Sequence, residues 1–223
     1  MTLPTPQAVV FDMDGLLLDT ERVYFEGFRT ALAALGLPQD DDLFRRLVGT
    51  NRLLGRRLLT EGLSGRVTLE EFDSVWDDEI AQRLADCIPV KPGARAVAEH
   101  LLERDIPYII ATSTQTEKAH LYLERAGLSE LFQDVVGGDQ VTASKPAPDI
   151  YLHATARLGH DPATCVAFED SPNGVRAAHA AGLITVQVPD IVVPDAELRA
   201  LGHYIACNII AGAHAVGLMV GRR

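Results

Sequence analysis

The chain has 223 residues, of which 47% are hydrophobic and 23% are charged, as in an ordinary globular protein. This length is enough for one large domain or for a core with a smaller insertion. The formal net charge of −11 argues against nucleic acid or an anionic membrane surface as the main partner. An anionic substrate would therefore need a bound cation and a few basic groups at its site.

The cysteines and the chain ends indicate where the protein works. Cys87, Cys165 and Cys207 match no zinc or disulfide spacing, so we expect each to be a buried, small hydrophobic residue. Free cysteines of this kind are typical of a protein in a reducing, cytoplasmic compartment. Residues 1–6 lack a basic region and a long apolar stretch, so we expect no signal peptide. The apolar window 204–221 is interrupted by glycines and polar residues, which favours a short strand and helix over a membrane span.

The first predicted strand comprises four apolar residues, 8–11, and two acids follow directly. Side chains two residues apart in an extended backbone share one side, so Asp12 and Asp14 would lie together. Carboxylates that close repel each other unless a cation or a shared proton relieves them. The alternative is a polar turn at the strand end, because Asp-Gly is a common turn pair.

The next segment, residues 21–86, has apolar residues at helical spacing and no convincing strand. After a linker at 88–93, strands and helices alternate, which is typical of a parallel sheet covered on both faces. We expect helices at 92–104, 117–126, 149–158 and 175–181, and strands at 107–112, 135–136, 165–168 and 184–188. The helical insertion follows the first strand, so it would lie as a lid over a ligand at the carboxyl ends of the strands.

The second predicted strand ends in hydroxyl residues. Thr114 and Glu117 fit a capping box, which predicts that a helix starts there. A helix N-terminus suits a phosphate, and Thr112 could add a hydroxyl donor. The alternative is that these hydroxyls only cap the helix.

Two later strand ends carry further charged groups. Lys145 precedes a proline that favours an extended backbone, so it could neutralise a phosphoryl oxygen; alternatively it is a solvated lysine in a turn. Glu169 and Asp170 follow strand 165–168 and could complete an oxygen-rich Mg²⁺ site. The alternative is that these acids compensate the dipole of a helix with Ser171 as N-cap.

The four strand ends occur in an order that a parallel sheet would bring to one edge. In this arrangement the chain resembles the haloacid dehalogenase-like hydrolases, in the branch of sugar-phosphate phosphatases and β-phosphoglucomutases. The resemblance implies a Rossmann-like α/β core, residues 1–19 and 91–223, with an inserted all-helical cap domain, residues 20–90. The motifs that carry it are Asp12-Met13-Asp14-Gly15, Thr112, Lys145-Pro146 and Glu169-Asp170.

The resemblance also implies a mechanism, phosphomonoester hydrolysis through an aspartyl-phosphate on Asp12. Asp14 would be the general acid and then the general base. Mg²⁺ would be held by Asp12, the Asp14 main-chain carbonyl and Asp170, with Glu169 in or near the shell. Lys145, Thr112 and the Ser113 N–H would carry the charge of the phosphoryl oxygens.

Residues of the insertion bear on the substrate. By the resemblance, a mutase carries a cap histidine where this chain has Tyr24, and residues 21–90 contain no lysine for a distal phosphate. Glu21, Tyr24 and Arg52 are the candidates for substrate selection, although Arg52 could be a solvated surface residue, and Trp76 is expected in the cap core.

Three functions therefore stay open at this point. The first is a monomeric Mg²⁺-dependent phosphatase that acts on a small phosphorylated metabolite, a sugar phosphate, with no nucleic acid or membrane as partner. The second is a β-phosphoglucomutase-type mutase. The third, from another class, is a catalytically silent protein that binds a metabolite.

Overall fold

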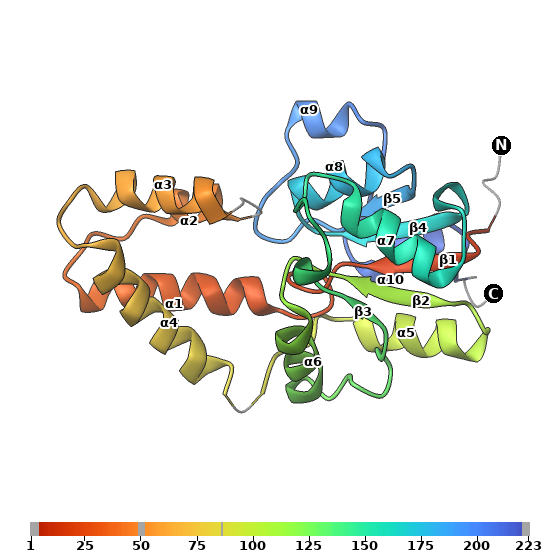
Figure 1. Cartoon of the computed structure of the whole chain (residues 1–223), viewed down its shortest axis with the longest axis horizontal. Coiled ribbons are helices and arrows are strands. Elements are labelled where there is room, and N and C mark those ends of the chain that lie inside the picture. The colour runs from red at the N-terminus through yellow and green to blue at the C-terminus, as the bar shows by residue number, and fades with distance from the viewer. Residues whose placement is uncertain (1–4, 49–51, 86, 220–223) are drawn as a thin grey trace.

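The central feature of the computed structural model is one six-stranded parallel sheet (Figure 1). The structure describes residues 5–48, 52–85 and 87–219. The strand order is β3-β2-β1-β4-β5-β6, and the expected α/β class with a Rossmann-like sheet is confirmed. The strands are β1 (Ala8–Phe11), β2 (Tyr108–Ala111), β3 (Val135–Val136), β4 (Cys165–Glu169), β5 (Ile184–Gln187) and β6 (Tyr204–Ile205).

The central strands are apolar throughout because helices cover both faces of the sheet. Val9 and Phe11 point into a cluster with α5, α6 and α10, whereas Ala8 and Val10 point into a cluster under α7 and α8. All four residues of β1 are fully buried. The core helices are α5 (Ala94–Glu103), α6 (Thr116–Arg125), α7 (Asp149–Leu158), α8 (Pro172–Ala180), α9 (Ala196–Arg199) and α10 (Ile209–Ala215), with short 3₁₀ turns at Gly138–Gln140 and Pro162–Thr164.

The described residues between β1 and α5 form four helices with an apolar cluster of their own, in which Phe28, Phe44 and Phe72 are buried. They are α1 (Thr20–Ala34), α2 (Asp41–Leu47), α3 (Arg52–Leu63) and α4 (Leu69–Arg83). The ring of Trp76 packs against these phenylalanines, with a centroid distance of 5.5 Å to Phe28. Figure 1 shows this helical insertion beside the sheet and not on either of its faces.

The two connections between the insertion and the sheet run side by side. The Asp19 N–H donates to the Pro89 carbonyl at 2.8 Å, and the Lys91 N–H donates to the Leu17 carbonyl at 2.9 Å. The Lys91 ammonium also pairs with Asp19 at 3.1 Å and with Asp190 at 2.6 Å. Entry and exit are thereby fastened to each other and to the loop after β5.

The predicted capping box at Thr114 and Glu117 is wrong. Helix α6 has Gln115 as its N-cap, whose side chain accepts no hydrogen bond, and the Thr116 N–H of the first turn donates to Asp139 Oδ1 at 2.7 Å. The Thr114 hydroxyl instead donates to the Asp14 carboxylate at 2.8 Å. The Thr114 N–H, which a capping box would offer to the Glu117 side chain, donates to the Thr112 hydroxyl at 3.1 Å.

The burial expected for the cysteines is right only for Cys165, which lies in β4. Cys87 and Cys207 are exposed. Both lie in connecting segments, and the buried positions nearby are taken by Ile88 and by Ile209, the first residue of α10. Within the described ranges, no helix combines the length and apolar character that a membrane crossing requires.

Two adjacent leucines of α5 provide a matched test of this packing. Leu101 is fully buried against the sheet, whereas Leu102 is 59% exposed. Leu101→Ala should lower the free energy of unfolding by about 2–5 kcal/mol because it leaves a cavity in the core. Leu102→Ala should change it by less than about 0.5 kcal/mol. Urea unfolding followed by circular dichroism measures both, and similar losses would contradict this packing of α5.

Candidate active site

A cavity of about 490 Å³ lies between the carboxyl ends of the strands and the helical insertion. In sheets of this strand order, ligands bind at this edge, where the order reverses beside the first strand. Its lining includes the residues that follow β1, β2 and β4 and four of the five candidates for phosphate and substrate contacts. From the core these are Asp12, Asp14, Thr112, Ser113, Thr114, Ser144, Lys145, Asp170, Ser171 and Asn173, and from the insertion Glu21, Tyr24, Phe44, Leu47, Val48 and Trp76.

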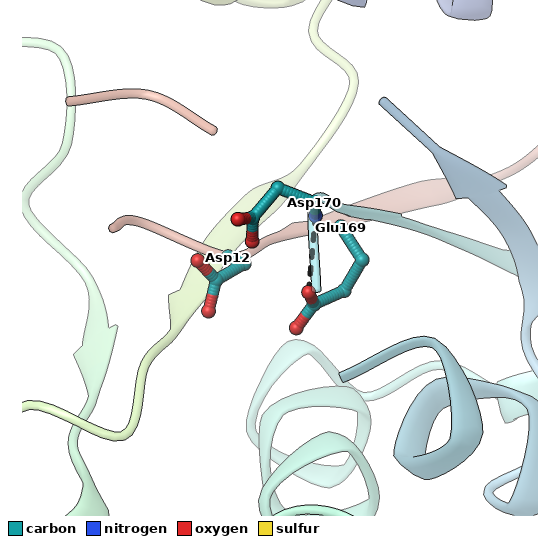
Figure 2. Close-up of side chains that lie close together, drawn as sticks. All are labelled: Asp12, Glu169 and Asp170. Carbon is teal, nitrogen blue, oxygen red and sulfur yellow. Dashed lines mark hydrogen bonds between the residues drawn. The ribbon is translucent and has the colours of Figure 1, made fainter. Parts of the chain in front are cut away.

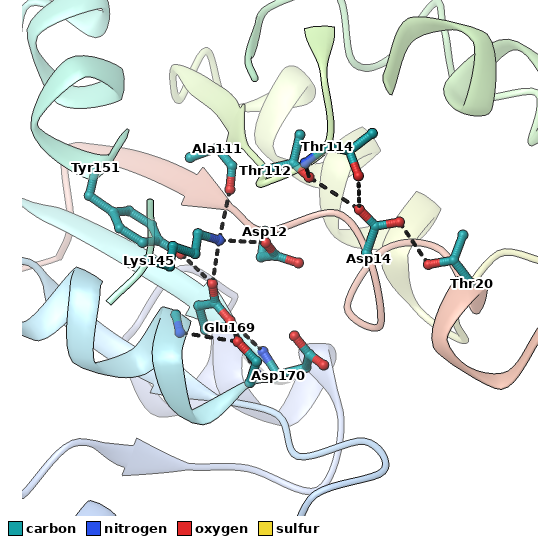
Figure 3. A network of polar contacts seen from close by, with 12 residues as sticks. Asp12, Asp14, Thr20, Ala111, Thr112, Thr114, Lys145, Tyr151, Glu169 and Asp170 are labelled. Carbon is teal, nitrogen blue, oxygen red and sulfur yellow. Dashed lines mark hydrogen bonds and ion pairs between the residues drawn. The ribbon is translucent and has the colours of Figure 1, made fainter. Parts of the chain in front are cut away.

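Lys145 is held between two carboxylates in the core wall of the cavity (Figure 3). Its ammonium donates to Asp12 Oδ1 at 2.6 Å, to Glu169 Oε1 at 2.6 Å and to the Ala111 carbonyl at 3.1 Å. Lys145 is only 7% exposed. Burial alone lowers the pKa of Lys145, but the charges of Asp12 and Glu169 outweigh it and raise the pKa, so the ammonium stays charged.

Both oxygens of the buried Glu169 carboxylate are occupied by donors. Oε1 accepts from Lys145 and from the Tyr151 hydroxyl, the latter at 2.7 Å. Oε2 accepts from the Asp170 N–H, the Ser171 N–H and the Ser171 hydroxyl, each at 3.1 Å. Gly174 allows this arrangement, because a Cβ there would lie 1.8 Å from Glu169 Oε1. Glu169 thus ties Lys145 and Tyr151 to the start of α8.

Tyr151 is a residue of this network to which sequence reasoning gave no role. It lies in α7, is fully buried, and its ring lies 5.1 Å from the Lys145 nitrogen. The available signal was its position six residues after Lys145, which places it in the first turn of the following helix.

Asp12, Glu169 and Asp170 form a buried acidic cluster (Figure 2). One carboxylate oxygen of each lies within 4.8 Å of the others. Burial and the neighbouring charges of Glu169 and Asp12 raise the pKa of Asp170. Burial also raises the pKa of Asp12, although Lys145 opposes it. Three carboxylates share one ammonium, so a hard cation that prefers oxygen ligands fits this cluster.

The Asp14 carboxylate is oriented by three threonine hydroxyls (Figure 3). Thr20 donates to Oδ1 at 2.8 Å, and Thr112 and Thr114 donate to Oδ2 at 3.1 and 2.8 Å. Thr112 was expected to face the phosphate, and here its hydroxyl contacts Asp14. Thr20 and Thr114 were not expected in the site. Thr20 begins α1, so the first helix of the insertion contacts Asp14 directly.

Two of the three candidates for substrate selection line the cavity. Glu21 and Tyr24 line the cavity from α1. Burial, with the charges of Asp14 and Asp190, raises the pKa of Glu21 to about 8. Burial also raises the pKa of Tyr24. Arg52 begins α3, but its side chain lies outside the described residues.

Trp76 belongs to the insertion core, as expected, but it also lines the cavity. The expectation that it would only pack is therefore too narrow. With Phe44, Leu47 and Val48 it forms the part of the cavity surface that we call the apolar wall. A residue at the edge of a small helical cluster can fill the cluster with one face of its ring and leave the other to a ligand.

Fold and site together define a class of α/β enzymes whose acidic centre lies at the strand ends under a helical insertion. A family model described as haloacid dehalogenase-like hydrolase matches residues 6–182. The chain belongs to the haloacid dehalogenase-like hydrolases, and it is therefore a hydrolase by family.

Three known proteins show the range of this similarity. A phosphorylated carbohydrates phosphatase of Thermotoga maritima is 39% identical over 177 residues, which cover 79% of this chain and 82% of the relative. (DL)-glycerol-3-phosphatase 2 of Arabidopsis thaliana is 38% identical over 190 residues, which cover 82% of this chain and 79% of the relative. The crystal structure of a haloacid dehalogenase family hydrolase from Deinococcus radiodurans, with bound phosphate and sodium, matches with a TM-score of 0.82 at 28% identity. The match covers 98% of this chain and 100% of that chain.

Tyr151→Phe tests whether the buried hydroxyl positions the Lys145–Glu169 pair. We expect kcat to fall about tenfold with little change in KM, because Glu169 loses a donor and Lys145 loses its fixed position. Steady-state kinetics with p-nitrophenyl phosphate measure the effect. Tyr108→Phe is the matched control, since its hydroxyl donates to the Leu131 carbonyl at 2.6 Å outside the cavity lining. Equal losses in both variants would contradict the positioning role.

Proposed function

We propose that this protein is a Mg²⁺-dependent phosphatase that hydrolyses small phosphorylated metabolites through an aspartyl-phosphate on Asp12. The observation that carries the proposal is the buried Asp12 carboxylate, paired with Lys145 and adjacent to Asp170, at the edge of a cavity between sheet and insertion. The family match and the phosphatase names of the relatives support it. Sugar phosphates, which the sequence predicts as substrates, belong to this class of metabolite.

In the first half of the reaction, an oxygen of Asp12 attacks phosphorus and the bond from phosphorus to the substrate alcohol breaks. Asp14, in its acid form, gives its proton to the departing alkoxide oxygen. Lys145 holds the nucleophile in place through the contact to Asp12 Oδ1, which leaves the second oxygen for attack.

In the second half, Asp14 accepts a proton from water, and the water oxygen attacks phosphorus. The bond between Asp12 and phosphorus then breaks, which releases phosphate and restores both carboxyl groups to their starting state. The three threonine hydroxyls keep the Asp14 carboxylate oriented for both transfers. The proposed contacts for phosphoryl oxygens are Lys145 and the main-chain N–H of Ser113, a residue that is exposed at the cavity. Thr112 was predicted for the same role, but its hydroxyl proton is donated to Asp14, so we propose that it orients Asp14 beside the phosphate.

Asp12, Asp170 and the Asp14 main-chain carbonyl are the proposed ligands of Mg²⁺. Glu169 belongs to the acidic cluster, but its five donors favour a role beside the metal shell over direct coordination. When bound, the metal ion compensates the excess negative charge and allows an anionic phosphate to approach an anionic nucleophile.

We further propose that residues 20–90 act as a cap over a core of residues 1–19 and 91–223. The separate apolar cluster of the insertion and the cavity lined from both parts support this division. Glu21, Tyr24 and Arg52 are the proposed cap residues for substrate selection. We also propose that the protein acts as a monomer on small metabolites, and the net charge of −11 supports the absence of nucleic acid or an anionic membrane as partner.

Asp12→Asn removes the proposed nucleophile while keeping the size of the side chain. We expect kcat for p-nitrophenyl phosphate to fall by at least about a thousandfold, because no covalent intermediate can form. Circular dichroism should show an unchanged fold. Turnover within about tenfold of the wild type would exclude Asp12 as the nucleophile. Absence of phosphate release by the wild type, with or without Mg²⁺, would favour the silent binding protein.

Metal removal tests the acidic cluster. EDTA should abolish phosphate release, and added Mg²⁺ should restore it. Mg²⁺ should also raise the melting temperature of the wild type, because it binds the folded state only. Asp170→Asn should weaken this thermal shift at equal Mg²⁺ concentration. A shift of the same size in both proteins would place the ion elsewhere.

The mutase alternative has a direct test with β-glucose 1-phosphate. Because Tyr24 lies where the resemblance places a mutase histidine, we expect free phosphate and glucose as the products. Phosphorus nuclear magnetic resonance distinguishes free phosphate from the phosphate ester. Accumulation of glucose 6-phosphate in its place would identify the protein as a mutase.

A further inference from the structure

The apolar wall defined above comes from α2, the residue that follows it and α4, whereas the acidic and hydroxyl groups of the core lining follow the strands. Phe44 is 2% exposed, and Leu47, Val48 and Trp76 are partly buried. A phosphate held at Asp12 and Lys145 would leave the alcohol part of the substrate in the remaining volume, toward these four side chains.

The polar atoms of the aromatic residues on this side already have protein partners. The Trp76 indole N–H donates to the Tyr24 carbonyl at 3.1 Å. The Tyr24 hydroxyl lies 3.4 Å from the Tyr122 hydroxyl and accepts from Lys118 at 3.5 Å. These side chains therefore offer a ligand mainly their ring surfaces.

Charged groups on the insertion side are few. Among its described residues at the cavity, Glu21 is the only acidic or basic one. A leaving group rich in hydroxyls would lose water at the apolar wall without gaining enough partners. Unpaired polar groups in a buried site cost binding free energy, whereas a hydrocarbon surface gains it.

We infer that the apolar wall selects phosphate monoesters whose alcohol part presents a hydrocarbon or aromatic surface with few hydroxyls. This inference rests on the proposed phosphatase function and narrows its substrate class. Among small phosphorylated metabolites, we expect a higher kcat/KM for esters of alcohols with a hydrocarbon or aromatic ring than for esters of fully hydroxylated sugars.

Two substrates of the same shape and leaving-group type test the inference. Glucose 6-phosphate and cyclohexylmethyl phosphate both join a six-membered ring to a primary phosphate ester, and they differ in the ring hydroxyls and ring oxygen. We expect kcat/KM to be at least about tenfold higher for cyclohexylmethyl phosphate. Phosphate release under identical Mg²⁺ and pH conditions measures both values. This comparison uses the wild-type protein, so it does not depend on a variant folding.

Val48→Thr adds a hydroxyl to the apolar wall with almost no change of volume. We expect it to reduce the ratio of the two kcat/KM values about threefold or more. Val75→Thr is the matched control, because Val75 packs in the same insertion cluster but does not line the cavity. It should keep the ratio within about twofold of the wild type.

The outcomes separate this inference from the function on which it rests. Release from both esters with glucose 6-phosphate preferred would overturn the inference and leave the phosphatase intact. A ratio that changes equally in Val48→Thr and Val75→Thr would also overturn it, since the wall would not be the cause. If no phosphate is released from the two esters or from p-nitrophenyl phosphate, the proposed function and the inference are both overturned.

Discussion

The burial of three carboxylates around one lysine is the constraint on which the site depends. Asp12, Glu169 and Asp170 are each at most 6% exposed, and Lys145 compensates only part of their charge. Removing such charges from water costs free energy unless opposite charges and hydrogen bonds replace the solvent. The structure meets this requirement for Glu169 with five donors. Asp12 and Asp170 have no comparable set of donors, and this difference is the basis of the proposed cation site.

The parallel sheet supplies the frame that makes this burial possible. Because β1 lies between β2 and β4, the residues after these strands are adjacent although they are far apart in the chain. Asp12 and Lys145 are separated by 133 positions and lie in direct contact. The insertion closes the other side of the cavity and contributes Thr20 to the hydrogen bonds of Asp14. The proposed catalytic groups and the apolar wall thus come from different parts of the fold.

Short-range signals in the sequence predicted the elements of the fold well. The apolar run before Asp12 forms a buried central strand, and the alternation after residue 93 forms the expected parallel sheet. Ser171 caps α8 as expected, since its hydroxyl accepts from the Gly174 N–H at 3.1 Å. The predicted capping box at Thr114 is wrong, because the Thr114 side chain is directed to Asp14, 100 positions away in the chain. A local pattern cannot include such a partner.

The sequence by itself determined the strand ends and the types of residue placed there, because alternation and strand-end chemistry depend on neighbouring residues. Only the tertiary structure decided which groups pair with which. In the folded chain the Tyr151 hydroxyl donates to Glu169, and the Thr112 hydroxyl donates to Asp14. Cys87 and Cys207 are exposed. The tertiary structure also placed Trp76 at the cavity. These outcomes follow from packing between distant segments, in which burial and competition among hydrogen-bond partners act over the whole chain.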